Sequence, residues 1–328
     1  MTTVETVRGP LDTADLGRVL MHEHIFVLSP EFVANYPDDD GFREQEQIPE
    51  AIRKLNELAA AGIDTIVVDP TVIGLGRYIP RIQRIAADTG INIVVATGLY
   101  TYNDVPHYLT FRPGGVMGGE DALVDLFVGD IVEGIADTGV KAAFLKCATD
   151  EPGVTPGVER VLRAVAKAQL RTSAPIMTHS HAVSRTGLKQ QDIFAEEGVD
   201  LRRVLIGHCG DTADLGYLTE VADRGSLLGM DRFGLDLDLL LPFDQRVGTV
   251  VALCERGYAS SMVLSHDAAC YMDWLPQQQI PVVVPNWHYL HITRDVLPAL
   301  RERGVSEQDI TTMLVANPRR FFEPVPTI

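Results

Sequence analysis

Short runs of apolar and β-branched residues alternate along the chain with longer stretches that carry apolar residues at helical spacing. A run of this kind, four to eight residues long and bounded by turn-forming residues, is typical of a buried strand. Eight such runs predict strands over Val19–Phe26, Thr65–Asp69, Ile91–Thr97, Val140–Lys146, Pro175–His179, Val204–His208, Ser226–Asp231 and Met262–Asp267.

Helical segments are predicted between these runs, for example over 48–62, 157–172 and 244–257. In 157–172 the apolar residues recur at a spacing close to that of one helix face: Val158, Val161, Leu162, Val165 and Leu170. Several segments end in glycine just before the next strand, as the C-terminus of a helix often does.

Repetition of strand and helix from start to end, without a break in composition, indicates an α/β fold with a parallel sheet. Eight units in 328 residues favour a closed (β/α)8 TIM barrel, expected as a single domain over residues 1–328. The alternative is an open, doubly wound sheet. Its main support would be a dinucleotide-binding glycine loop, but the candidate Gly74-Leu75-Gly76 lacks the third glycine.

Composition narrows the possible partners. Acidic residues outnumber basic ones 45 to 28, a formal net charge of −17, and this excess disfavours nucleic acid and anionic membranes. We find neither a secretory signal nor an apolar run approaching the roughly 18 residues of a transmembrane helix. Four cysteines without CxxC spacing indicate reduced thiols, so we expect a cytoplasmic protein that acts on a small molecule or binds a metal cation.

Side chains of the metal-binding type occur at the C-terminal ends of five predicted strands. In a TIM barrel these ends meet at one mouth, where the active site lies. The residues are His22, His24, Lys146, His179, His208 and Asp267.

The pair His22-Glu23-His24 has a geometric explanation. Residues i and i+2 of a strand share a face, so both histidines can point into the mouth while Glu23 points away. By itself, such a pair is equally consistent with two core or surface histidines. Together with the later histidines and Asp267 it favours a metal site for zinc, iron, cobalt or manganese.

Lys146 does not fit a simple ligand set, because an ammonium group has no lone pair and repels cations. A lysine at this place usually extends outward from the edge of the core. However, two divalent ions bring about four positive charges, against about two negative ones from Asp267 and a hydroxide. Reaction of Lys146 with CO2 would give a carbamate that adds a negative charge and can bridge two metals, which we state as a hypothesis.

Several motifs resemble those of the phosphotriesterase-like lactonases, in the phosphotriesterase branch of the amidohydrolase superfamily. They are TVIGLGRY, ATGLYTYND, LKCATDEPG, IGHCGDT, GMDRFG and NPRRFF, and the similarity runs from about residue 7 to 323. The resemblance implies a TIM barrel, usually a homodimer, that hydrolyses N-acyl-homoserine lactones (quorum quenching) and other lactones. It also implies weak activity on organophosphate triesters.

The resemblance also implies roles for the metal-type residues. One metal would be held by His22, His24 and Asp267, and a second, more exposed one by two further histidines. Spacing leaves open whether His179 or His181 is a ligand, whereas the family pattern selects His179, together with His208. Carboxylated Lys146 and a hydroxide would bridge the two ions.

The resemblance places Tyr100 beside the bridging hydroxide and the substrate carbonyl, and Arg232 in the pocket. Dedicated phosphotriesterases carry histidine at the position of Arg232, so the arginine favours the interpretation as a lactonase and predicts poor turnover of phosphotriesters. The implied mechanism is attack of the hydroxide on the lactone carbonyl, with Tyr100 stabilising the oxyanion and Asp267 passing the proton to the leaving alkoxide. Asp211 could continue the proton path, although an N-cap of the following helix is the favoured reading.

Apolar residues in the loops after the last two strands suit an acyl tail. We expect Phe233, Leu235, Tyr271 and Trp274 near the mouth, although each could instead pack under its loop or form a dimer contact. Three alternatives to the lactonase remain. They are a dedicated phosphotriesterase, another amidohydrolase such as a mononuclear deaminase, and a non-catalytic metal-binding barrel.

Overall fold

The computed structural model describes residues 2–36, 41–63, 67–237 and 240–325. Seven strands form one parallel sheet in sequence order. They are β4 (Val67–Asp69), β5 (Ile93–Gly98), β6 (Phe144–Ala148), β7 (Ile176–His179), β8 (Val204–Ile206), β9 (Leu227–Met230) and β10 (Met262–Leu264).

The first and last strands of the barrel meet through a second parallel pair. β3 (His24–Val27) pairs with β11 (Ala269–Met272), which follows β10 closely along the chain. Backbone bonds from Asp267 N to His22 O (2.9 Å) and from His24 N to Ala268 O (2.8 Å) extend this contact. β3 also lies against β4. The predicted (β/α)8 TIM barrel is thus confirmed, although no backbone ladder joins β3 to β4 among the described residues.

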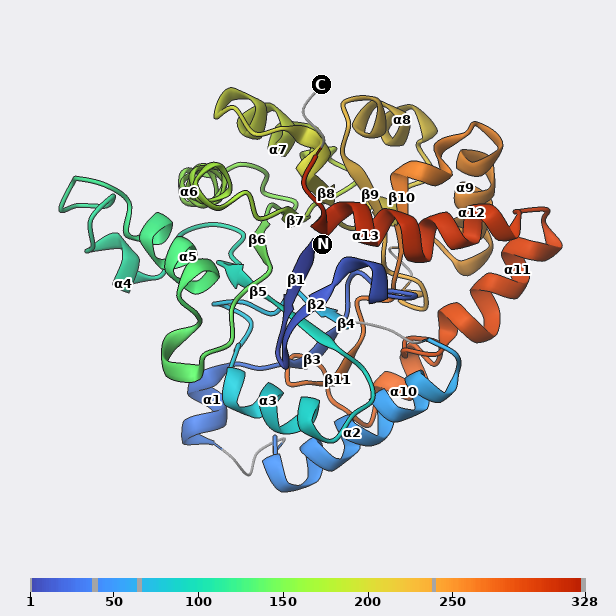
Figure 1. Cartoon of the computed structure of the whole chain (residues 1–328), viewed down its shortest axis with the longest axis horizontal. Coiled ribbons are helices and arrows are strands. Elements are labelled where there is room, and N and C mark those ends of the chain that lie inside the picture. Colours follow the sequence, from blue (N-terminus) through green and yellow to red (C-terminus); the bar gives the residue numbers. More distant parts are fainter. Residues whose placement is uncertain (1, 37–40, 64–66, 238–239, 326–328) are drawn as a thin grey trace.

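Helices surround the strands, as Figure 1 shows. The longer ones are α2 (Glu44–Ala60), α3 (Ile79–Ala87), α5 (Ala122–Val132), α6 (Pro156–Thr172), α7 (Thr186–Glu196), α8 (Leu215–Asp223) and α9 (Phe243–Glu255). The chain ends in α11 (Leu297–Glu302), α12 (Glu307–Thr311) and α13 (Asn317–Phe322), and α1 (Pro30–Asn35), α4 (His107–Thr110) and α10 (Ile280–Val283) lie in loops. None of the described helices is long and apolar enough to cross a bilayer.

Helix α6 illustrates how the sequence pattern produces this layer. Thr155 caps its first turn by accepting a hydrogen bond from Val158 N, and Pro156 occupies the first helical position. The predicted apolar face is buried except for Leu170, which is about half exposed (51%).

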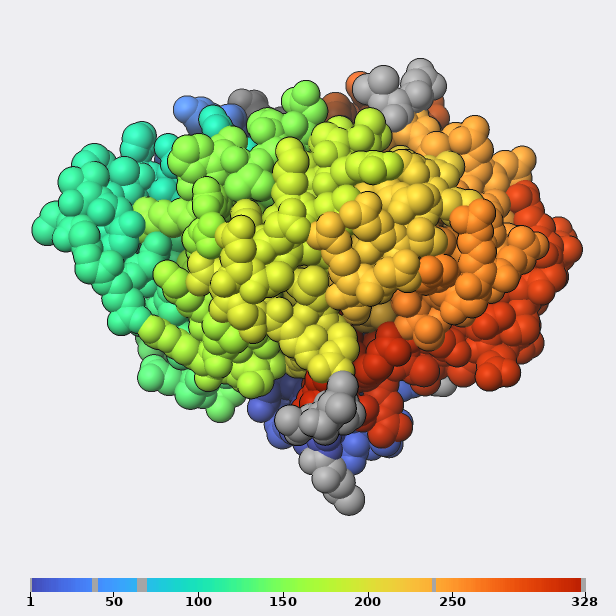
Figure 2. All heavy atoms as spheres, turned by 90° about the horizontal axis from the view of Figure 1, so that it is seen from above, coloured from blue at the N-terminus to red at the C-terminus, as the bar shows by residue number. Residues whose placement is uncertain are grey.

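A hairpin of β1 (Thr3–Thr6) and β2 (Gly9–Asp12) covers the N-terminal end of the barrel, where Val7 N donates to Ile93 O (2.8 Å) at the start of β5. Figure 1 shows this hairpin across the middle of the ring. At the side of the barrel, the segment around α4 projects outward in both views (Figure 2).

Side chains from successive strands fill the barrel interior, namely Val94, Phe144, Met177, Leu205, Leu227 and Val263. This packed layer matters for the site because side chains alternate along a strand. Lys146 and His179 follow Phe144 and Met177 by two residues, so both extend from the interior toward the mouth.

The strand ends differ from the prediction at three ligand-type positions. β3 begins at His24, near the end of the predicted strand Val19–Phe26, because pairing with β11 carries the ladder outward. β8 and β10 stop before His208 and Asp267, since both residues have left-handed backbone (φ 62° and 54°) that no regular strand accommodates. Part of the predicted strand Thr65–Asp69 lies outside the described residues.

Candidate metal-binding active site

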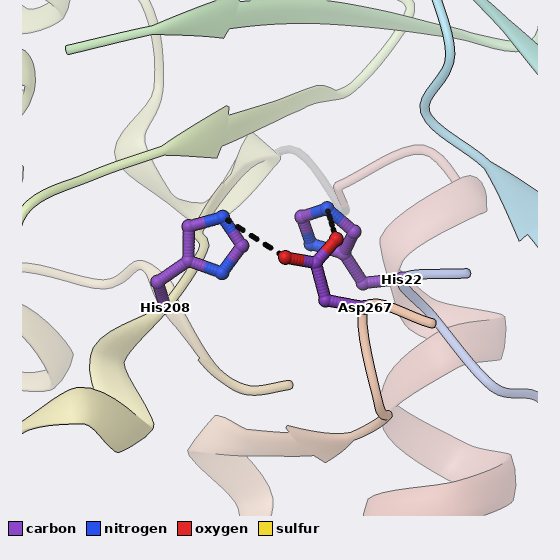
Figure 3. A group of neighbouring side chains, drawn as sticks. All are labelled: His22, His208 and Asp267. Carbon is purple, nitrogen blue, oxygen red and sulfur yellow. Dashed lines mark ion pairs between the residues drawn. The ribbon is translucent and has the colours of Figure 1, made fainter. Parts of the chain in front are cut away.

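The six metal-type residues predicted from the sequence lie together at the mouth of the barrel. Asp267 lies between two imidazoles: its Oδ1 is 3.4 Å from His22 Nε2 and its Oδ2 is 3.9 Å from His208 Nε2 (Figure 3). Ligand atoms of these three residues all fall within 4.8 Å of one another. His24 Nε2 approaches the same carboxylate at 3.1 Å.

His179 and Lys146 complete the group. His179 Nδ1 lies 2.9 Å from His208 Nε2, and Lys146 Nζ lies 3.4 Å from His22 Nε2 and 3.3 Å from Thr178 O. The alternative ligand His181 instead contacts Ser184 Oγ (2.6 Å). The structure therefore brings His179, and not His181, to the cluster.

Asp231 holds two of the imidazoles from behind, a role that our sequence reasoning missed. Its Oδ2 contacts His22 Nδ1 (2.8 Å), and its Oδ1 contacts both His208 Nδ1 (3.0 Å) and His208 N (2.8 Å). Strand alternation could have revealed it, because Asp231 follows the interior residue Leu227 by four positions and so faces the mouth.

The other two histidines have similar outer partners. His24 Nδ1 contacts Thr71 Oγ1 (2.8 Å), and His179 Nε2 contacts Asp150 Oδ2 (2.7 Å). With one ring nitrogen held in this way, the other nitrogen of each ring points toward its neighbours in the cluster. Such outer partners orient metal-binding histidines and fix their tautomers.

Burial sets the charge state of the basic residues. It lowers the pKa of His22 and His208 below the ordinary value and that of His179 to about 4, so neutral rings with a free lone pair predominate at neutral pH. Burial also lowers the pKa of Lys146 to about 8. For Asp267, burial alone would raise the pKa, but His22 and its other basic neighbours outweigh this effect and hold it well below the ordinary value.

The left-handed backbone at His208 redirects its side chain. Leu205 faces the interior, so regular alternation would turn His208 outward, away from the mouth. With φ of 62° the chain leaves the strand and the imidazole joins the cluster. A left-handed non-glycine residue costs about 1–3 kcal/mol and is typical of functional sites.

A cavity of about 220 Å³ opens above the cluster. Its lining includes the polar residues Tyr100, Tyr102 and Arg232 and an apolar group, which we call the apolar side, formed by Leu235, Leu237, Met272, Trp274 and Leu275. Trp274 is about half exposed (48%). The predicted pocket residues Tyr100, Arg232 and Trp274 therefore do line a cavity.

Two predicted mouth residues are elsewhere. Phe233 is buried in the hydrophobic core, and Tyr271 is buried with its ring against Phe42 (5.4 Å between centroids). Neither belongs to the described cavity wall. Of the two alternatives left open for both residues, packing beneath the loops is the one the structure shows, because these aromatic rings gain from burial.

Arg232 links the cluster to Asp211. Its Nε donates to Asp267 Oδ2 and its Nη1 to Asp211 Oδ2, each at 2.9 Å. The favoured reading of Asp211 as a helix cap is wrong, because Asp214 caps α8 by accepting from Tyr217 N (3.1 Å).

Tyr100 places its hydroxyl within hydrogen-bond reach of the Tyr102 hydroxyl and 3.3 Å from His179 Nδ1. Burial raises the pKa of this phenol well above the ordinary value, so it remains a hydrogen-bond donor at neutral pH.

Glu23 faces away from the mouth, as predicted. Its carboxylate accepts hydrogen bonds from Ser265 Oγ (2.8 Å), His266 N (2.9 Å) and Ala268 N (3.1 Å), and it contacts His266 Nδ1 (2.6 Å). It thereby braces the segment that carries Asp267.

The sequence profile of the phosphotriesterase family matches residues 2–322. The chain belongs to the phosphotriesterase family. A phosphotriesterase homology protein of Mycobacterium tuberculosis is 62% identical over 324 residues, which cover 98% of each chain. An aryldialkylphosphatase of Saccharolobus solfataricus is 42% identical over 317 residues, or 96% of this chain and 98% of that one. The solved structure of the phosphotriesterase from Mycobacterium tuberculosis superposes with a TM-score of 0.95 at 61% identity, over 98% of both chains.

Membership of the phosphotriesterase family makes the chain a hydrolase of a generally metal-dependent group. The donor set fits divalent metal ions. Four buried imidazoles and one ionised carboxylate converge on a small volume, and each imidazole is held by an outer partner. Imidazole and carboxylate are the ligands expected for zinc and similar cations.

Proposed function

We propose that the chain is a binuclear metal-dependent lactonase that hydrolyses N-acyl-homoserine lactones and other lactones, with weak activity on phosphotriesters. The observation that carries the proposal is the mixed lining of the cavity. The polar residues Tyr100 and Arg232 suit the lactone ring, and the apolar residues Leu235 and Trp274 suit an acyl tail.

The metal-holding residues follow from the cluster. His22, His24 and Asp267 would hold one ion, and His179 and His208 the other, with carboxylated Lys146 between them. When bound, two divalent cations such as zinc, iron, cobalt or manganese would polarise the carbonyl and supply a nucleophile at neutral pH.

The protein's own groups would then serve the reaction. The Tyr100 phenol donates a hydrogen bond to the carbonyl oxygen as negative charge develops there. Asp267 takes the proton of the attacking water and delivers it to the ring oxygen that leaves, giving an open hydroxy acid. Arg232 holds Asp267 Oδ2 through its Nε (2.9 Å), which fixes the direction of that carboxylate.

The test is a pH-indicator assay of the metal-loaded protein on N-acyl-homoserine lactones of graded chain length, beside a phosphotriester. We expect faster turnover of the lactones and a KM that falls as the tail lengthens along the apolar side. A higher rate on the phosphotriester would overturn the proposed substrate. Two ions per chain by elemental analysis support the binuclear site, whereas one ion favours a mononuclear amidohydrolase and no turnover favours a binding protein.

We also propose that the protein forms a homodimer. The projecting segment around α4 exposes large apolar side chains, each between 64% and 73% exposed, namely Tyr108, Phe111, Val116 and Met117. Light scattering after size exclusion gives the mass directly, and a monomer at micromolar concentration would contradict this proposal.

A further inference from the structure

A row of four alternating charges leads from the cluster into the protein. Asp267 contacts Arg232, Arg232 contacts Asp211 Oδ2, and Asp211 Oδ1 contacts Arg246 Nη1, with 2.9 Å between the nitrogen and oxygen of each pair. Arg246 belongs to α9 and does not line the cavity.

Burial makes each pair in this row depend on the others. The Arg246 side chain is 1% exposed and that of Asp211 is 8% exposed, so water cannot replace a lost partner. Each carboxylate oxygen of Asp211 faces a different arginine. Arg246 meets Asp211 Oδ1 as an ion pair without hydrogen-bond geometry, so its removal would leave that buried oxygen with no cation beside it. The Asp211 carboxylate would then be free to turn, and Arg232 and Asp267 would follow.

Arg246 also binds the end of a chain segment that contributes Leu235 and Leu237 to the apolar side of the cavity. Its Nε donates to Leu241 O (2.9 Å) and its Nη1 to Gly210 O (2.7 Å). Leu240 N in turn donates to Leu237 O (2.8 Å), and Leu237 lines the cavity. One guanidinium therefore contacts both the charge row and the backbone four residues beyond Leu237, which lines the cavity.

We propose that Arg246 is a positioning residue that couples the direction of the Asp267 carboxylate to the apolar side of the cavity. Catalytic rate and acyl-chain preference would thus depend on a residue that touches no substrate. This inference rests on the proposed lactonase function for its kinetic consequences, but its structural consequence is independent of the substrate.

Two substitutions separate the two contacts. Arg246→Met removes both, whereas Arg246→Lys keeps a positive charge beside Asp211 but cannot also replace the bond to Leu241. Arg203→Met is the control, because Arg203 is also buried (7% exposed) and binds Phe321 O (3.2 Å) and Ser173 O (2.8 Å) far from the cluster.

The metal-loaded variants are compared by lactone kinetics and by amide hydrogen exchange of peptides covering 233–237 and 240–246. For Arg246→Met we expect kcat to fall about tenfold, because small displacements of a reacting group are costly. KM for long-chain lactones should rise relative to short-chain ones, with faster exchange in both peptides. Arg246→Lys should recover most of kcat but neither the chain-length preference nor the slow exchange.

Equal effects of Arg246→Met and Arg203→Met would overturn the proposal, since they would reveal a merely structural arginine. So would unchanged kcat and unchanged exchange in Arg246→Met. If Arg246→Met does not fold, Arg246→Lys tests the proposal instead, by whether most of kcat is kept while the chain-length preference in KM is lost. Should the unmodified protein hydrolyse no lactone, the proposed function fails, while the exchange measurement still decides the coupling.

Discussion

Asp231 offers the sharpest test of the metal centre, because one carboxylate orients two proposed ligands. It accepts hydrogen bonds at 2.8 Å from His22 Nδ1 and at 2.8 and 3.0 Å from the backbone and ring of His208. The substitution Asp231→Asn keeps the shape of the side chain, but it replaces one carboxylate oxygen by the NH2 of an amide, which can only donate hydrogen bonds. One of the two imidazoles then loses its acceptor and is pushed toward the tautomer that offers a proton to the metal.

The size of the effect follows from the bond that is lost. A hydrogen bond to a charged group contributes about 1.5–3 kcal/mol, which corresponds to roughly 10- to 150-fold in an equilibrium constant. Outer partners of metal-binding histidines are worth a similar 10- to 100-fold in affinity, by order of magnitude. We therefore expect the metal Kd of Asp231→Asn to rise by about 10- to 100-fold.

Competition with a chromogenic chelator measures this Kd directly. Asp130→Asn is a suitable control. Asp130 lies on α5, away from the cluster, is also buried, and pairs with Arg77 (2.9 Å) and Thr97 (2.6 Å). A Kd of Asp231→Asn within twofold of the unmodified protein would refute the orienting role. An equal loss in both variants would point to general destabilisation.

Three further outcomes are expected. In Gly229→Ala the added Cβ would lie 2.5 Å from Asp231 Oδ2, so the carboxylate must move and metal affinity should fall in the same chelator assay; unchanged affinity contradicts this. Glu23→Gln removes a buried charge that holds four donors and should lower the free energy of unfolding by about 2–4 kcal/mol in urea titration, whereas a loss below about 0.5 kcal/mol would show that the brace is dispensable. Lys146→Ala should lose activity and regain part of it in millimolar bicarbonate or a short-chain carboxylate; full activity without these additions rules out the carbamate.

The convergence of the proposed ligands could be predicted because it depends on two regular properties of a barrel. Side chains alternate along each strand, and the C-terminal ends of all strands meet at one mouth. These properties are sufficient to bring Lys146 and His179 together from different strands and to turn Glu23 away. They would also have placed Asp231 at the mouth, had it been considered.

The parts that could not be predicted depend on contacts between segments far apart in the sequence. Asp150, which holds His179, is one example. It lies in the loop after β6, and the sequence of that loop has no periodic pattern from which the contact could be predicted. The inward packing of Phe233 and Tyr271 is likewise a property of loops, where no alternation distinguishes a buried ring from an exposed one. The left-handed backbone at His208 lies in a region that few non-glycine residues occupy, so the strand pattern gives no sign of it.

The pairing of β3 with β11 has a consequence for how the protein is made. The hydrogen bond from His22 N to Ser265 Oγ spans 243 residues, and contacts of such long range are slow to form because a long loop must first be closed. A chain still under synthesis, or cut after β9, contains His22 and His24 but has neither Asp267 nor the strand that β3 needs as its neighbour. The complete cluster can therefore form only once the last barrel strand is in place, so tight metal binding would serve as a signature of chains folded through to that strand.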